Sequence, residues 1–473
     1  MSLVEDSATA KLAKPPVKRE VRRVADVAAE KLADLARARS VDDAGAGWVA
    51  DFRARGLKQF ETAGFPARLA EAWRHTDLRK LRESTFVDPP EGTDAADLID
   101  DYSIGDAAAI ELVFVDGRLD PQRTRCSEVR GVLVQSLAEA LKGDLLEGPL
   151  GSLADREVNP FVALNDANVS DGAVVTIDED ATIDKPIHLL FLSTGGNKEA
   201  ATVSHPRTFV VAAKGATATL VETYAGRPGT TYLTNAVTEI IVGEGCDLDH
   251  VKLNRESDAA FHVATMEVHL AAEAKWVSHS GTLAGGLTRN DLNVTLAGEG
   301  CYPTLNGLVI GTGASHADNH TLLRHNVPNC QSYELYKHVM EDRSTGVFKG
   351  KIYVAQDAQK TDAVQNSRSL LLSDDARMNS QPALEIYADD VKCTHGSTTG
   401  PLDDGAIFYL NSRGVDLDMS RRLLTYAFAA DVTRRIKVAA VRERIEAFMA
   451  RQHGLPTDFR IQELAEATED LVF

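Results

Sequence analysis

The chain has 473 residues, 44% hydrophobic and 26% charged, which is typical of a soluble globular protein with two or three domains or one elongated core. Its net charge of −19 argues against nucleic acid or an anionic membrane as the main partner, because both bind a positively charged face. Five scattered cysteines do not indicate a disulfide framework, and no apolar run approaches the ~20 residues of a membrane span. Since the N-terminus also lacks the apolar core of a secretory signal, the cytoplasm is the expected location.

The N-terminal third is predicted to be mostly helical. Residues 1–18, which include two consecutive prolines, are expected to be a disordered tail. Residues 19–150 are expected to form a helical region with one short strand at 110–119. Within it, apolar residues three or four apart indicate helices over about 19–39, around Trp48 to Phe60 and over 71–81. The polar, acidic stretch 84–108 is expected to be a loop.

The character of the chain changes near Asn159, and residues 151–414 are predicted to be a β-rich core. Short β-rich runs alternate there with turn residues. Small residues follow turns at Ala216, Cys246, Ala274 and Cys301, in steps of 30, 28 and 27 residues. A period of this length suits two short strands per coil of a β-solenoid, whose coils stack on their neighbours. A large β-sandwich with coincidental turns is the alternative.

A helical pattern returns after Gly414, and residues 415–473 are predicted to be a C-terminal helical region. Leu423, Leu424 and Phe428 belong to one apolar stripe, and a second stripe includes Val441 and Phe448. Helical regions on both flanks suit a solenoid, because its open sheet edges must be covered or paired.

The candidate functional residues are Cys393 and His395, which stand two residues apart in a predicted strand. Side chains at this spacing point to the same face, with Cα atoms roughly 6.5 Å apart. A thiolate and an imidazole so placed can both reach one metal ion. Two ligands do not complete a site, so the others would come from elsewhere, for example from another chain. The alternative is that both residues simply fill the last coil.

Other chemically active residues fit structural roles better. His316, Asp318 and His320 alternate along another predicted strand and have the spacing of metal ligands, but such triplets often lie on solvated faces. His325, Cys330, Cys246 and Cys301 are expected to be structural, and Cys126 has no evident role. Three lysines, near Gly346 and Gly350, lack the Gly-rich loop and Lys-Ser/Thr pair of a nucleotide-hydrolysing site. These lysines are Lys349, Lys351 and Lys360.

Several segments, in order, resemble the SufB/SufD family of iron–sulfur cluster assembly subunits. They include EAWRHTDL (71–78), NPFVALNDAN (159–168), the dense block RHNVPNC…NSRSLLLS (324–373) and LEIYADDVKCTHGSTTGPLDDGAIFYLNSRG (384–414). The resemblance covers about residues 60–450. The KC-x-HG form and EAWRHTDL favour the SufD branch over the paralogous SufB branch, which remains the nearest alternative.

The resemblance implies a mainly β fold, a right-handed parallel β-helix flanked by N-terminal and C-terminal helical regions. It implies a non-catalytic scaffold that pairs with SufB and binds the ABC-type ATPase SufC, or forms a homodimer when alone. Cys393 and His395 match family positions at the SufB interface, where a transient iron–sulfur cluster is expected, and a flavin is sometimes associated with such complexes. The resemblance places ATPase docking on the helix from Met419 to about Met449. Its candidate contact residues are Leu423, Leu424, Phe428, Arg434 and Arg435.

Two rival functions come from other classes. One is a β-helix enzyme that acts on polysaccharide. Many such enzymes are secreted and carry a catalytic cluster on one outer sheet, but this chain shows neither a secretory signal nor an obvious cluster. The other is a free-standing metal-binding protein, which would use His316, Asp318 and His320 as ligands instead of Cys393 and His395.

Overall fold

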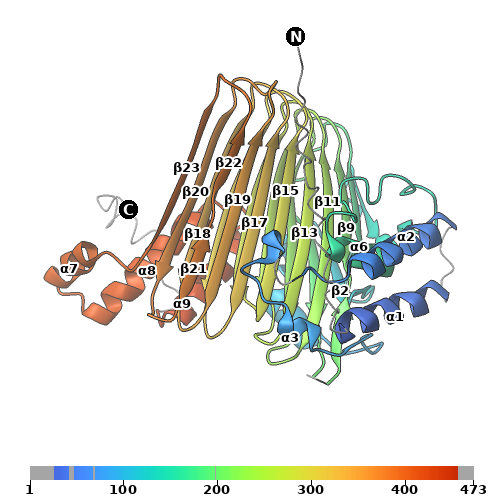
Figure 1. Ribbon diagram of the computed structural model, residues 1–473, viewed down its shortest axis with the longest axis horizontal. Coiled ribbons are helices and arrows are strands. Elements are labelled where there is room, and N and C mark those ends of the chain that lie inside the picture. Colours follow the sequence, from blue (N-terminus) through green and yellow to red (C-terminus); the bar gives the residue numbers. More distant parts are fainter. Residues whose placement is uncertain (1–25, 42–46, 68–69, 198, 456–473) are drawn as a thin grey trace, which may run out of the picture.

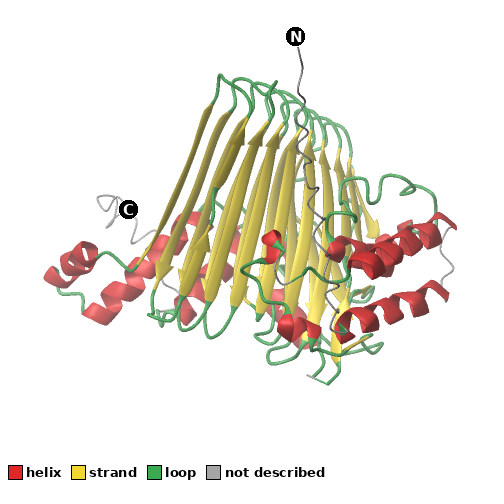
Figure 2. Ribbon diagram, viewed as in Figure 1, coloured by secondary structure: helices red, strands yellow, loops and turns green. Residues whose placement is uncertain are grey.

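Two long β-sheets form the body of the protein and face each other (Figures 1 and 2). The computed structural model describes residues 26–41, 47–67, 70–197 and 199–455, so the predicted tail at 1–18 lies outside the described residues. From residue 172 to 400 the chain alternates between the two sheets, and each strand from residue 207 on pairs in parallel with a strand one coil earlier, whereas three pairs nearer the N-terminus are antiparallel. This parallel stacking confirms the β-helix and excludes the β-sandwich.

Sheet A contains 12 strands among the described residues. From β5 to β21 its strands follow the order of the coils, and β1, β8 and β22 pair beside this path. The bounds are β1 (Phe86–Val87), β5 (Val132–Ser136), β6 (Gly172–Ile177), β8 (Ala201–Ser204), β9 (Arg207–Ala212), β11 (Tyr232–Val242), β13 (Phe261–Leu270), β15 (Leu287–Leu296), β17 (His316–His325), β19 (Thr345–Val354), β21 (Arg377–Ser380) and β22 (Ala383–Ile386).

Sheet B contains 11 strands in the described part of the chain and ends at β23. Its path runs from β3 through β2 to β23, with β4 paired to β2. The bounds are β2 (Ile110–Val115), β3 (Arg118–Leu119), β4 (Arg125–Cys126), β7 (Ile187–Ser193), β10 (Thr217–Gly226), β12 (Asp247–Arg255), β14 (Lys275–Ala284), β16 (Tyr302–Gly311), β18 (Gln331–Met340), β20 (Asp362–Leu371) and β23 (Lys392–Gly400).

The periodic small residues mark the corners before four successive strands of sheet B, β10, β12, β14 and β16. Ala216, Cys246, Ala274 and Cys301 are each at most 2% exposed. The amide after each corner residue donates to the carbonyl of the corner residue one coil earlier, at 2.8–2.9 Å along this series. Small side chains are needed here because successive coils approach to ~4.8 Å. The repeat seen in the sequence is therefore the coil repeat of the β-helix, and Cys246 and Cys301 are core residues, as expected.

The N-terminal helices cover part of the outer face of sheet A, except the helix at residues 96–102, which packs against sheet B (Figure 1). Helix α6 begins after Asn159, whose side chain accepts a hydrogen bond from the Phe161 amide at 2.9 Å, and Pro160 occupies the first turn. Two expectations need revision: residues 71–81 form two short pieces, and the expected loop 84–108 contains β1 and α4. The bounds are α1 (Val27–Val41), α2 (Gly47–Ala63), η1 (Glu71–Trp73), α3 (Arg79–Arg82), α4 (Ala96–Tyr102), η2 (Gly105–Ala107), α5 (Leu137–Ala140) and α6 (Pro160–Asn168).

The C-terminal helices cover the outer face of sheet B. Apolar side chains of α8 (Leu417–Thr433) and α9 (Ala439–Gln452) pack against outward residues of β10, β12, β16 and β18. Helix α7 (Asp404–Ser412) lies within the range expected for the β-rich core and projects beyond β23 (Figure 1). No helix in the described part of the chain is long and apolar enough to cross a membrane.

Candidate metal-ligand site at the open end of the β-helix

Strand β23 is the last strand of sheet B and forms one edge of it. It pairs with β20, and no other described strand pairs with it. Charges, prolines and bulges commonly protect such edges from other chains. Over its nine residues β23 has a single charged side chain, Lys392, and no proline. The edge is therefore suited to pairing with a further strand.

Cys393 and His395 both lie on the inward side of this strand. Their register partners on β20 are Ala363 and Gln365, which are each 0% exposed. Cys393 is half-buried and His395 is exposed, because no further coil covers β23 in the described chain. The two donors are thus core positions of a coil that lacks its neighbour. A strand added to β23 would enclose them.

The chemistry available here is that of a neutral thiol and an accessible imidazole. Burial, and secondarily the charge of Asp362, raises the pKa of the Cys393 thiol. A metal ion that binds this sulfur must therefore displace a proton. Among the described residues, no group of three or more His, Cys, Asp or Glu side chains could hold a metal ion. The pair is a partial ligand set in this chain.

Polar groups continue behind the pair along the same inward row. Gln365, the register neighbour of His395, donates from Nε2 to Glu334 Oε2 at 2.6 Å. Glu334 is fully buried, and burial raises its pKa to about 7. Ser397, also inward on β23, donates to Ser380 Oγ of β21 at 2.9 Å and so links the two sheets at the last coil.

The open end also has an apolar rim on sheet A. Ile386 and Tyr387, at and just after the end of β22, are 37% and 61% exposed. Large apolar side chains in this position would be covered if another chain extended the sheets. The end of the β-helix therefore combines an unprotected edge, an apolar rim and an incomplete ligand set.

The alternating residues His316, Asp318 and His320 do share one face, as their spacing predicts, but this face is the outer one of sheet A. Asp318 is bound by Arg289 Nη1 at 2.7 Å and by His320 Nε2 at 3.0 Å, and the Thr76 hydroxyl donates to it. The guanidinium of Arg289 is the main cause that holds the pKa of Asp318 below its usual range. These contacts give the triplet a structural role, which joins residues 72–76 to the sheet.

The predicted contact residues on α8 and just after its end divide into two groups. Leu424 is 3% exposed and packs against α7, while Leu423 and Phe428 are partly buried against the outer face of sheet B. Arg434 and Arg435 are exposed, and both pair with Asp431. The apolar stripe is therefore mainly internal packing.

The most exposed apolar residues of this region lie on α7 and at the start of α8, and sequence patterns did not single them out. Phe408 is 74% exposed, Leu417 47% and Tyr409 37%. The run AIFYL contains Ala406 and Ile407, which are buried, next to Phe408, which is not. Hydrophobicity alone does not separate the two sets.

The other cysteines do not join the candidate site. Cys246, Cys301 and Cys330 are buried in the core, where the thiols of Cys246 and Cys301 donate to backbone carbonyls at 2.7 and 2.9 Å. His325 contacts the Ser332 hydroxyl at 3.0 Å and is buried, in line with its expected structural role. Cys126 is exposed at the far end of sheet B.

Comparison with known proteins agrees with this architecture. The family model for the SufBD core domain of the SUF system for FeS cluster assembly matches residues 192–428, and the model for the SufBD N-terminal region matches residues 34–189. The iron-sulfur cluster assembly protein SufD of Escherichia coli (strain K12) is 32% identical over 400 residues, which cover 82% of this chain and 89% of the relative. The SufBD family protein slr0076 of Synechocystis sp. is 32% identical over 80% of this chain and 86% of the relative. SufD of Bacillus subtilis is 26% identical over 62% of this chain and 66% of the relative. The chain therefore belongs to the SufBD family of iron–sulfur cluster assembly proteins.

Proposed function

We propose that the chain is a non-catalytic scaffold subunit of the iron–sulfur cluster assembly machinery and that it acts with a second scaffold chain. The observation that carries this proposal is the uncovered last coil. Cys393 and His395 point inward there, while their neighbours Ala363 and Gln365 on the previous coil are completely buried. A second chain that continues the coils would cover the same positions.

The expected second chain is a SufB-type paralogue. It would add a strand to β23 and so supply main-chain hydrogen bonds along an edge with a single charge. Cys393 and His395 would then contribute a thiolate and an imidazole to a cluster completed by donors of the partner. Thiolates are the usual ligands of iron–sulfur clusters, and imidazole is the less common one. The cluster is cargo of the complex, and a flavin bound by the complex is assigned to no residue of this chain.

The ATPase partner, of the SufC type, is proposed to dock on α7 and the start of α8. Phe408, Tyr409 and Leu417 form the apolar part of this surface, and Arg434 and Arg435 are its candidate polar contacts. Exposed aromatic and arginine side chains are frequent anchors of protein interfaces. The projection of α7 beyond β23 would let ATP-driven movement of the docked subunit act on the open end. Five free thiols support a reducing compartment, for which we propose the cytoplasm.

Co-expression with SufB-type and SufC-type subunits tests the ligand role. Iron and sulfide would be measured in purified complexes that contain wild type, His395→Ala or Cys393→Ser. Thr394→Ala is the matched control, because Thr394 lies between the two donors on the other face of the strand. We expect assembly in all four complexes, with less iron in the two ligand variants and normal iron in the control. Unchanged iron in both ligand variants would refute the role.

The scaffold role itself is tested by the oligomeric state of the chain, first in isolation and then with the paralogue. Size-exclusion chromatography with light scattering would follow the isolated chain, then the mixture with the SufB-type subunit. We expect a homodimer through β23 to give way to a heterodimer. Failure to bind the paralogue, or cleavage of uronic-acid polymers by the isolated chain, would contradict the proposal.

A further inference from the structure

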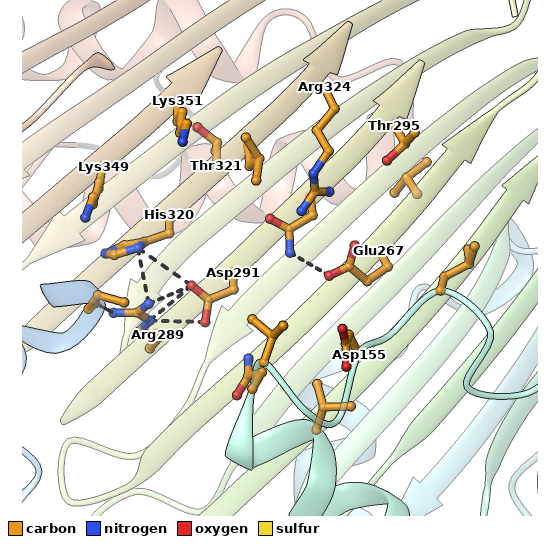
Figure 3. Close-up of a pocket in the computed structure, with 18 of the residues that line it drawn as sticks. Asp155, Glu267, Arg289, Asp291, Thr295, His320, Thr321, Arg324, Lys349 and Lys351 are labelled. Atoms are coloured by element: carbon orange, nitrogen blue, oxygen red, sulfur yellow. Dashed lines mark hydrogen bonds and ion pairs between the residues drawn. The ribbon is translucent and has the colours of Figure 1, made fainter. Parts of the chain in front are cut away.

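A pocket lies on the outer face of sheet A (Figure 3), whereas Cys393 and His395 lie on the inward side of sheet B. Its floor is formed by outward side chains of β13, β15, β17 and β19, and the segment before α6 and residues 72–73 form its walls. The cavity holds about 540 Å³. Pockets that bind small molecules commonly enclose about 300–1,000 Å³.

Three cations converge on one side of this pocket. Lys349 and Lys351 stand two residues apart on β19, and Arg324 lies diagonally across from Lys351 on β17. Such neighbours are about 7 Å apart at the backbone, within reach of long side chains. This cluster is positive on a chain whose net charge is −19, so its sign is opposite to that of the protein as a whole.

None of these three cations is strongly engaged within the described chain. Lys349 meets Glu71 at 3.5 Å, but that carboxylate is 92% exposed. Lys351 pairs with the half-exposed Glu385 at 2.6 Å. Arg324 makes no hydrogen bond or ion pair with any described residue. Exposed ion pairs contribute little, so a bound anion can replace them.

A fourth cation, Arg289, is part of the framework instead. It is 2% exposed and donates to Asp291 Oδ1 and Asp318 Oδ2, both at 2.7 Å, and to the Ala72 carbonyl at 2.6 Å. Its guanidinium lies 4.1 Å from the centre of the Trp73 ring. Two carboxylates more than neutralise this single charge, and the network fixes the wall of the pocket against its floor.

A carboxyl group with a raised pKa, Glu267, lies beside Arg324 (Figure 3). Glu267 accepts from Asn293 Nδ2 at 2.6 Å, and burial raises its pKa to about 7 (Figure 3). The hydrogen bond from Asn293 and, after it, the charge of Arg324 lower this pKa, while Glu239 and Asp291 reinforce the rise. At neutral pH, Glu267 therefore cancels only part of the positive charge beside it.

We propose that this pocket binds a small phosphate-bearing molecule, with its phosphate held by Arg324, Lys349 and Lys351. Three cations with weak internal partners fit a group with more than one negative charge. The two lysines would contact the phosphate from one strand of the β-helix, so this site needs no Gly-rich loop. The apolar wall formed by Trp73, Leu153 and Pro160 can cover the rest of the ligand.

Calorimetric titration of the full chain with inorganic pyrophosphate, at constant ionic strength and pH 7.5, tests this assignment. We expect saturable binding to wild type, and about tenfold weaker binding or more in Lys351→Ala and in Arg324→Gln. Lys214→Ala is the matched control: this lysine also pairs with an exposed glutamate, at 2.8 Å, but lies outside the pocket. It is expected to bind like wild type.

Glu267→Gln gives a result that misfolding cannot imitate. Glutamine keeps the shape of the side chain and removes the negative charge next to Arg324, so we expect tighter binding of pyrophosphate than in wild type. No saturable binding to wild type, equal losses in Lys214→Ala and Lys351→Ala, or weaker binding in Glu267→Gln would overturn the proposal.

Discussion

The substitution Arg207→Ala tests how the N-terminal region is held on the β-helix. Arg207 of β9 is completely buried between two buried carboxylates, Asp166 of α6 and Glu239 of β11. Removing one member of such a buried network leaves charges without a counter-ion, which costs about 3–5 kcal/mol. Asp166 retains Arg156 at 3.1 Å, and Glu239 retains three backbone amides of residues 151–154 at 2.8–3.1 Å. We therefore expect a loss at the lower end of this range, about 3 kcal/mol in the free energy of unfolding. This corresponds to roughly a hundredfold change in the unfolding equilibrium constant.

Urea denaturation at pH 7, followed by tryptophan fluorescence, measures this loss. Hydrogen exchange would localise it, since the amides of Gly151, Leu153 and Ala154 that donate to Glu239 should lose protection first. Lys214→Ala, which breaks an exposed ion pair with Glu244, should leave the midpoint unchanged. If Arg207→Ala shifted the midpoint no more than this control, the reasoning from burial would be refuted.

Three further predictions concern docking, pH and packing. Phe408→Asp should leave the unfolding midpoint unchanged but weaken binding of the ATPase subunit at least tenfold in a pull-down titration. Leu145→Asp, at another exposed apolar site, should bind the ATPase subunit like wild type. Equal binding by the two variants would exclude α7 as the docking surface. Glu334 has a pKa of about 7 in the folded protein, against about 4.3 in the unfolded chain, so the folded protein binds one more proton between these pH values. The free energy of unfolding should therefore fall as pH rises from 5 to 7, by at most about 1.4 kcal/mol per pH unit. Glu334→Gln should reduce the difference between urea midpoints at pH 5 and pH 7, and an unchanged difference would contradict the assignment. Gly307→Ala should lower the free energy of unfolding by about 1–3 kcal/mol, because its Cβ would lie 2.1 Å from the Tyr336 ring. A urea midpoint equal to wild type would show that the ring moves freely.

The coil repeat was predictable because it depends on local chemistry. Each corner between stacked coils needs a small residue after a turn, so Ala216, Cys246, Ala274 and Cys301 recur at almost constant spacing. The common face of Cys393 and His395 was predictable for the same reason, since strand geometry sets it. Segment 84–108 shows the limit of local patterns, because α4 forms there by packing Leu98 against β2 and β7.

The repeating coil, its helical flanks and the two donors on one strand face could all be predicted from spacing along the chain. Three other features emerge only when the whole chain is folded: β23 is an uncovered edge, the stripe of α8 faces inward while Phe408 faces out, and Arg324, Lys349 and Lys351 gather on one surface. These properties depend on which residues stand side by side across coils about 30 positions apart. Exposure and long-range register result from the packing of the whole chain, and no short window of sequence contains them.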